Sequence, residues 1–162
     1  MVLAYLSGPI IISENRKDAF YKTVIEVLQL RSVEVFAPQF LPPADATIIY
    51  RRDVDALRKS SMVIAEISDP SHGVGMEIML AIELKKPLIL FHRKDELYLS
   101  KMVIGASGSA IFEYASVDEV AAILQSMNLS ELVLKKCSGC PSHIAAREND
   151  IYWCVRCGKR IS

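Results

Sequence analysis

One stretch constrains the fold more than any other: an apolar segment that passes through a short turn into an apolar helix. Residues 62–67, MVIAEI, have the composition of a buried strand, and residues 68–71, SDPS, interrupt it. Beyond Gly73 and Gly75, apolar residues recur at helical spacing as far as position 84. A strand, a turn and a helix in this order form part of a βαβ unit, so the stretch predicts an α/β protein with a parallel sheet.

Glu77 follows the second of these glycines and is the first candidate for chemistry. We place it in the first turn of the helix, where the positive end of the helix dipole would keep its carboxylate ionised and able to act as a nucleophile. The alternative is an acidic residue that merely complements the dipole. Ser71, Gly73 and Gly75 favour a functional role, because they leave a hydroxyl and open backbone that a ligand could approach.

Strands and helices alternate along the rest of the main domain. Five strands are expected, at residues 2–6, 33–36, 62–67, 87–91 and 111–114. Strands separated by helices and short loops are typical of a doubly wound five-stranded parallel sheet with a flavodoxin-like or Rossmann-like layout. Ser13 is expected to cap the first helix, and the proline-rich residues 37–45 are expected to form a loop over the ligand crevice.

Charge and hydropathy exclude several classes of protein. The 19 basic and 19 acidic residues balance, so no overall charge favours nucleic acid or an anionic membrane as a partner. No apolar run is long enough to cross a bilayer and the first residues lack the features of a signal peptide, so we expect a cytoplasmic protein. The ligand is therefore expected to be a small molecule that is recognised locally.

The last part of the chain differs in composition because it contains all the cysteines. They form two CxxC pairs: Cys137, Cys140, Cys154 and Cys157. This pattern is typical of a structural zinc site in which four thiolates hold one Zn²⁺ and leave no open position for catalysis. Disulfides or a redox pair are the alternative, which a cytoplasmic location disfavours. We expect an α/β domain over residues 1–130 and a four-cysteine zinc ribbon over residues 131–162, folded by its metal.

Several segments of the main domain resemble the nucleoside 2-deoxyribosyltransferase superfamily, and within it the 2'-deoxynucleoside 5'-phosphate N-hydrolases. The segments are Tyr5-Leu6-Ser7-Gly8-Pro9, Asp53, Ala65-Glu66-Ile67, Pro70-Ser71-His72-Gly73-Val74-Gly75-Met76-Glu77 and Gly108-Ser109. The resemblance covers residues 2–128 and leaves the cysteine-rich tail outside. It implies an N-glycosidase that needs no organic cofactor and cleaves the base–sugar bond of 2'-deoxynucleoside 5'-monophosphates.

The resemblance also implies roles for individual residues. Glu77 would attack the sugar C1' and form a covalent deoxyribosyl-enzyme, Tyr5 would orient its carboxylate, and Asp53 would help the base to leave. The substrate-binding residues implied are Ser7, Gly8, Pro9, Ile10, Ser71, Gly73, Gly75, Ser107, Gly108 and Ser109. One phosphate-binding serine of such hydrolases comes from the neighbouring subunit of a dimer and is matched by Ser109, so we expect a homodimer with shared active sites. The loop at residues 105–109 also has the composition of an anion-binding nest, with an ordinary turn as the alternative.

A nucleoside 2-deoxyribosyltransferase that exchanges bases on free deoxynucleosides is the first alternative. Pro9-Ile10-Ile11 resembles that branch, because it lacks the serine and arginine expected of the phosphate hydrolases. Ser71 favours the hydrolase, since an acidic residue at this position would repel a phosphate. Arg16, Arg51 or Arg52 could supply the missing phosphate contacts.

A non-catalytic nucleotide-sensing module is the second alternative. The ribbon of such a module would contact nucleic acid or a protein partner through its basic residues, although such charges are usually a solvated surface. The presence of Tyr5, Asp53 and Glu77 together argues against this alternative.

Overall fold

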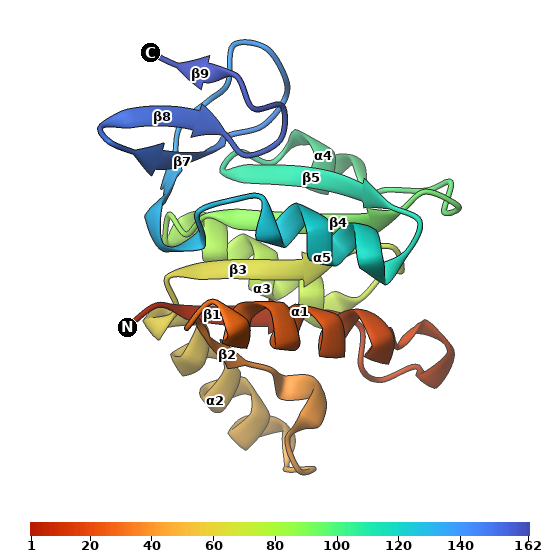
Figure 1. The fold of residues 1–162 in the computed structure, drawn as a ribbon. Coiled ribbons are helices and arrows are strands. Elements are labelled where there is room, and N and C mark those ends of the chain that lie inside the picture. Colours follow the sequence, from red (N-terminus) through yellow and green to blue (C-terminus); the bar gives the residue numbers. More distant parts are fainter.

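The computed structural model describes residues 1–162, which fold into two sheets (Figure 1). The first sheet is five-stranded and parallel, with the order β2-β1-β3-β4-β5. Its strands are β1 (Leu3–Ser7), β2 (Glu34–Phe36), β3 (Met62–Glu66), β4 (Leu88–Arg93) and β5 (Ser109–Tyr114). This order is that of flavodoxin-like doubly wound sheets, so the predicted fold class is confirmed.

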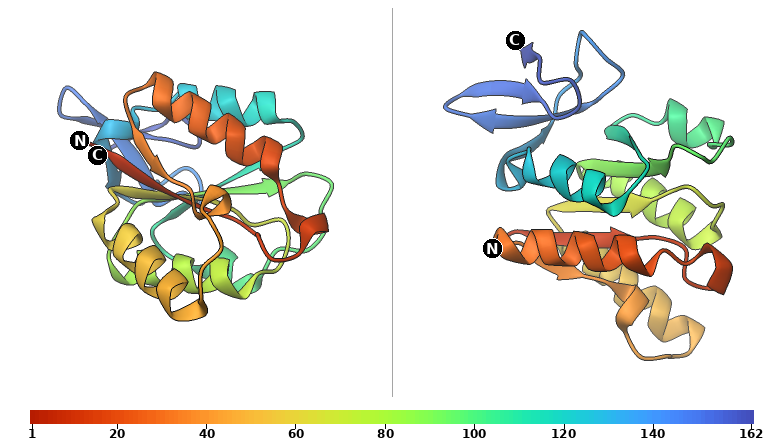
Figure 2. Two further views of the ribbon diagram at one scale, coloured as in Figure 1. Left: turned by 90° about the horizontal axis from the view of Figure 1, so that it is seen from below. Right: turned by 45° about the vertical axis from the view of Figure 1, so that its right-hand side comes forward.

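Helices cover both faces of this sheet (Figure 2). They are α1 (Asp18–Leu30), α2 (Ala46–Lys59), α3 (His72–Glu83), the short α4 (Lys101–Gly105) and α5 (Val117–Gln125). Helices α1 and α5 pack together on one face over a core that contains Phe20 and Phe91, whereas α2 and α3 pack on the other over a core that contains Val63 and Leu90. None of the helices combines the length and the apolar character needed to cross a bilayer.

Side-chain caps set the start of three helices. The Asp45 carboxylate accepts hydrogen bonds from the backbone amides of Thr47 and Ile48 in the first turn of α2, at 3.0 and 3.1 Å. Ser71 caps α3, and Ser116 caps α5. Because these caps satisfy amide groups that have no partner within the helix, they fix where the chain leaves the loops at the ligand-facing edge of the sheet.

The start of α1 differs from the prediction. Ser13–Asn15 form a separate 3₁₀ turn, so Ser13 does not cap α1, which begins at Asp18. The intervening residues make contacts with distant loops instead. Arg16 donates to the carbonyl of Gln39 at 2.7 Å, and the Lys17 ammonium lies 2.6 Å from the Asp69 carboxylate. These tertiary contacts hold the chain out of the helix that its local pattern favours.

The second sheet is antiparallel, with the order β6-β7-β8-β9, and lies beyond β5 (Figure 1). Its strands are β6 (Leu132–Leu134), β7 (Ile144–Glu148), β8 (Ile151–Cys154) and β9 (Arg160–Ile161). His143 N–H donates to the Ser109 carbonyl at 2.9 Å, and Ile144 belongs to the core under α1 and α5. This cysteine-containing ribbon therefore packs firmly on the main sheet, while the boundary between residues 130 and 131 stays a prediction.

Candidate active site

The Glu77 side chain reaches from α3 to the end of β1. Tyr5 Oη donates to Glu77 Oε1 at 2.6 Å, and Ser7 Oγ donates to Oε2. Side chains on a helix point back toward its N-terminus, which is why a residue of α3 can meet the last residues of a neighbouring strand. Two donors on opposite oxygens hold the carboxylate in one orientation. The structure thus brings Tyr5 and Glu77 together, and it adds Ser7 as a second donor.

The position of Glu77 in α3 and its electrostatics differ from the prediction. Because α3 begins at His72, Glu77 lies in the second turn, where the dipole effect has largely fallen off. Burial raises the pKa of Glu77, hydrogen bonds from Ser7 and Tyr5 oppose this rise, and the Asp53 charge adds to it. The hydrogen bonds, rather than the helix dipole, are therefore what favours the charged form.

Tyr5 is itself fully buried, and its phenol remains a donor. Burial raises the pKa of Tyr5, and the neighbouring Glu77 carboxylate raises it further. Its ring stacks on Phe36 with centroids 5.5 Å apart, which fixes the direction of the hydroxyl. Tyr5 therefore presents a neutral, oriented O–H to the carboxylate and does not compete with it for a proton.

A cavity of about 620 Å³ lies between α2 and α3 and is lined by both Asp53 and Glu77. Asp53 accepts from Arg52 Nε at 2.7 Å, and its side chain is 14% exposed. Most of the other lining residues are apolar, including Tyr50, Met76 and Leu80. Glu83 also lines the cavity. An apolar wall with the Asp53 and Glu77 carboxylates beside it suits a flat ring attached to a sugar, because the ring is bound by contact and these acids reach the bond between ring and sugar.

Gly8 and Pro9 are held by a residue that the sequence analysis missed. Tyr21 Oη donates to the Pro9 carbonyl at 2.8 Å, and a Cβ added at Gly8 would lie 2.4 Å from the Tyr21 ring. Gly8 is therefore required by the close approach of this ring. Gln39, also missed, donates to the Leu6 carbonyl at 3.0 Å from the proline-rich segment. No local pattern signals either contact, since both join segments far apart in the chain.

Gly73 and Gly75 lie inside α3, not in a turn before it. A Cβ at either position would have nothing within 4 Å. Glycine inside a helix costs about 1 kcal/mol relative to alanine, and packing within this chain does not explain that cost. Gly73 lines the cavity, and Ser71 lies just before it at the helix start. This surface is therefore open to a ligand or a partner.

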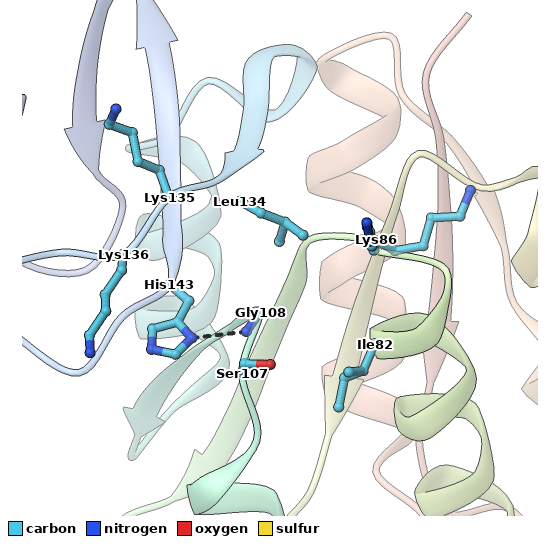
Figure 3. A pocket seen from close by; sticks show the side chains of 9 residues that line it. Ile82, Lys86, Ser107, Gly108, Leu134, Lys135, Lys136 and His143 are labelled. Carbon is cyan, nitrogen blue, oxygen red and sulfur yellow. Dashed lines mark hydrogen bonds between the residues drawn. The ribbon is translucent and has the colours of Figure 1, made fainter.

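Three predicted site residues lie elsewhere. Ser109 begins β5 and is paired with Leu88, the first residue of β4, whereas Ser7 ends β1. Strands β3 and β4 lie between β1 and β5, so the axes of β1 and β5 are about 14 Å apart. Ser107 and Gly108 line a different cavity, shown in Figure 3. Ser109 is 6% exposed, which counts against its contact with a partner's substrate, so that role stays a prediction.

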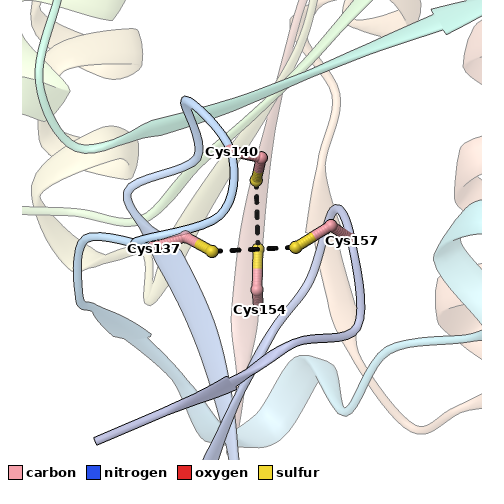
Figure 4. A group of neighbouring side chains, drawn as sticks. All are labelled: Cys137, Cys140, Cys154 and Cys157. Atoms are coloured by element: carbon pink, nitrogen blue, oxygen red, sulfur yellow. Dashed lines mark hydrogen bonds between the residues drawn. The ribbon is translucent and has the colours of Figure 1, made fainter.

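The four cysteines of the ribbon form one cluster (Figure 4). Their sulfur atoms all lie within 4.8 Å of one another, with Cys137 and Cys157 at 3.7 Å and Cys140 and Cys154 at 3.5 Å. All four are free thiols. A zinc ion bound tetrahedrally at about 2.3 Å from each sulfur places the sulfurs about 3.8 Å apart. The cluster therefore has the dimensions and donor set of a metal site.

Comparison with known proteins gives a consistent result. Residues 4–133 match the family model described as nucleoside 2-deoxyribosyltransferase. A 5-hydroxymethyl-dUMP N-hydrolase of Tetraodon nigroviridis is 40% identical over 81 residues, which cover 48% of this chain and 56% of that protein. The chain spans about half the length of the curated relatives that it matches.

Two solved structures share the fold. The CMP N-glycosidase BcmB of Clostridium botulinum superposes with a TM-score of 0.59 at 21% identity, over 76% of this chain and 98% of that one. A 2-deoxyribosyltransferase of Bacillus psychrosaccharolyticus superposes with a TM-score of 0.58 at 20% identity, over 76% of this chain and 96% of that one. At these identities the similarity concerns the fold alone.

Proposed function

The chain belongs to the nucleoside 2-deoxyribosyltransferase family, and on this premise we propose that it hydrolyses the N-glycosidic bond of 2'-deoxynucleoside 5'-monophosphates. The observation that carries the proposal is the Glu77 carboxylate, held by Tyr5 and Ser7 in a cavity that also contains Asp53. The products would be a free base and 2-deoxyribose 5-phosphate.

Glu77 acts as the nucleophile in the proposed reaction. A bond forms between its carboxylate oxygen and C1' as the bond from C1' to the base nitrogen breaks, and the base nitrogen takes up a proton that we assign to Asp53. Water then attacks C1' of the covalent intermediate and gives one proton to the Asp53 carboxylate, which restores the acid. This step breaks the bond between C1' and Glu77, releases the sugar phosphate and restores the Glu77 carboxylate. Tyr5 and Ser7 keep the carboxylate aimed at C1' in both steps, and the negative charge beside the ring stabilises an oxocarbenium-like transition state.

Ser71 and the start of α3 carry the preference for a monophosphate. The first amides of a helix bind anions, and a serine hydroxyl adds a donor there. The relative with 40% identity is named for a monophosphate substrate, which supports this assignment. The Arg16 guanidinium already donates to the Asp18 carboxylate and to the Gln39 carbonyl. We therefore do not assign the phosphate contact to Arg16.

Base exchange on free deoxynucleosides is the second candidate function. Pro9 and Ile10 favour it, because residues 8–12, which directly follow β1, offer no polar side chain to a phosphate. Ile10 is 37% exposed there, and Pro9 uses its carbonyl to accept from Tyr21. A transferase needs the same covalent intermediate but passes the sugar to a second base instead of water, so the acceptor decides between the two functions.

We also propose a homodimer that covers the open side of the cavity. Tyr50, Met76 and Met79 are 58%, 61% and 51% exposed on α2 and α3. In the segment after β4, Tyr98 and Met102 are 87% and 84% exposed. Tyr50, Met76 and Met79 line the cavity. Exposed apolar surface beside a cavity marks an interface, and a second copy would bury it and exclude water from the reacting bond. Met79→Glu should produce monomers in analytical ultracentrifugation, with a control in Lys22→Glu on α1.

We propose that the four cysteines hold one structural Zn²⁺. The ion would neutralise the thiolates and fold the ribbon, which is too small to bury much apolar core by itself. It supplies no chemistry at Glu77, because four sulfur ligands leave it no open position. Metal analysis of the protein purified under reducing conditions should find one zinc per chain.

Product analysis tests the proposed function. The protein is incubated with 2'-deoxynucleoside 5'-monophosphates and with free deoxynucleosides, each with and without a second free base, and the products are separated by chromatography. Free base from a monophosphate without an acceptor is the expected result. Exchange that occurs only with free nucleosides and an acceptor would replace the hydrolase with the transferase. Glu77→Gln, which keeps the shape of the side chain, should lower either activity by several orders of magnitude.

A further inference from the structure

A second cavity, of about 370 Å³, lies where the ribbon meets the α/β domain (Figure 3). It is built from the end of α3, the loop before β5, and the ribbon residues next to β6 and β7. Four of its nine lining residues are lysines and none is acidic: they are Lys85, Lys86, Lys135 and Lys136. In a chain with balanced charge, this is a strong local excess of positive charge, and it favours an anion.

The lysines are not neutralised by carboxylates. Lys86 Nζ donates to the carbonyls of Arg58 and Ser60, and Lys135 Nζ lies 4.5 Å from the centre of the Tyr152 ring. Lys85 and Lys136 form no ion pair. Carbonyls and a ring fix the first two ammonium groups without removing their charge, so all four contribute to the potential in the cavity.

His143 adds a donor whose position is set by hydrogen bonds from both parts of the chain. The Gly108 amide donates to His143 Nδ1 at 3.0 Å, so the ring carries its proton on Nε2. The His143 amide donates to the Ser109 carbonyl, and its own carbonyl accepts from the Lys135 amide, both at 2.9 Å. Figure 3 shows the ring beside Ser107 and Gly108. Part of the cavity is therefore preorganised rather than formed by flexible lysines alone.

We propose that this cavity binds the phosphate group of a small phosphorylated molecule, at a site separate from Glu77. Several ammonium groups, an imidazole N–H and the Ser107 hydroxyl together suit an anion with more than one charge and several acceptor oxygens. The volume falls in the range of small-ligand sites, at about 300 to 1,000 Å³. The site includes Ser107 and Gly108, which belong to the loop whose small, polar composition predicts anion binding. An anion bound there would lie near the C-terminal end of α3, whereas the proposed reaction takes place nearer its N-terminal end.

Inorganic phosphate is the probe for a test on the protein over residues 1–162, purified with zinc. Phosphate is titrated while NMR follows the Gly108 amide and the His143 side chain, and His72 at the start of α3 reports separately on the Glu77 end. We expect saturable shifts at Gly108 and His143. Lys85→Gln and Lys136→Gln should each raise the dissociation constant about tenfold, since a hydrogen bond to a charged group contributes about 1.5 kcal/mol or more. Lys22→Gln, an exposed lysine on α1, is the control and should change nothing.

Three results would overturn the proposal. Shifts at His72 alone would place the phosphate only at the proposed active site. Equal weakening by Lys22→Gln and Lys136→Gln would show a general charge effect. Tighter, strongly salt-dependent binding of a short single-stranded oligodeoxynucleotide at Gly108 would identify a nucleic-acid surface instead. Because the reporters and variants avoid Glu77, loss of the proposed hydrolase would leave this test unaffected.

Discussion

Tyr5→Phe removes one of the two hydrogen bonds that hold the Glu77 carboxylate and little else. The phenol donates to Oε1 at 2.6 Å, while its ring stacks on Phe36 and would keep that contact as phenylalanine. A hydrogen bond to a charged group contributes about 1.5 to 3 kcal/mol. If that energy is realised in the transition state, kcat/KM should fall by about 10- to 150-fold.

The pH dependence of the same variant is more diagnostic than its rate. Burial raises the pKa of Glu77, and the hydrogen bonds from Ser7 and Tyr5 lower it. Removing the Tyr5 bond therefore raises this pKa further. The nucleophile must be ionised, so the acid limb of the kcat/KM profile should move to higher pH in Tyr5→Phe.

Tyr21→Phe is the matched control. It removes a phenol that donates to the Pro9 carbonyl at 2.8 Å and does not contact Glu77. Its unfolding free energy should fall by about 1 to 3 kcal/mol, because a buried carbonyl loses its partner, while the acid limb stays in place. The reasoning is refuted if the acid limb of Tyr5→Phe also stays in place, or if both variants shift it equally.

Three further substitutions test packing, metal and buried charge. Gly8→Ala brings a Cβ to 2.4 Å from the Tyr21 ring and should lower the unfolding free energy by about 1 to 3 kcal/mol in urea denaturation, whereas Gly75→Ala, with nothing within 4 Å, should not lower it. Cys140→Ser should abolish zinc binding and lower the midpoint of thermal unfolding in one transition; a separate, low-temperature ribbon transition would contradict this. Burial raises the pKa of Glu66, so its charge lowers stability as pH rises above about 4.3, and Glu66→Gln should be the more stable protein at neutral pH but not in acid.

The fold could be predicted because its signals are local. The apolar segment that forms β3 lies within one short window of sequence, and the alternation of such segments with helical ones is enough to indicate a parallel sheet. The start of α3 was misplaced because glycine usually breaks a helix. Here Ser71 caps the helix, which then runs through Gly73 and Gly75 and moves Glu77 into its second turn.

The candidate site was predictable only in part. The family resemblance names Tyr5, Asp53 and Glu77, and the structure places the last two in one cavity with Tyr5 hydrogen-bonded to Glu77, while their catalytic roles stay predictions. Tyr21 and Gln39 were missed because each binds a carbonyl of a segment far away in sequence. Such contacts depend on how the segments are placed in the folded chain. Because every residue has a backbone carbonyl, the sequence does not indicate which carbonyl will be an acceptor.

If the ribbon holds the proposed zinc and the chain has the proposed activity, the bond from His143 to Ser109 has a consequence for how metal supply affects that activity. The ribbon lies along β5, the last strand of the parallel sheet, and contributes Ile144 to the main core. A chain that never acquires its metal would leave that strand edge and part of the core uncovered, a state prone to association with other chains. Scarcity of zinc would then reduce the number of competent molecules while each surviving molecule turns over at its normal speed, so Vmax would fall with kcat and KM unchanged.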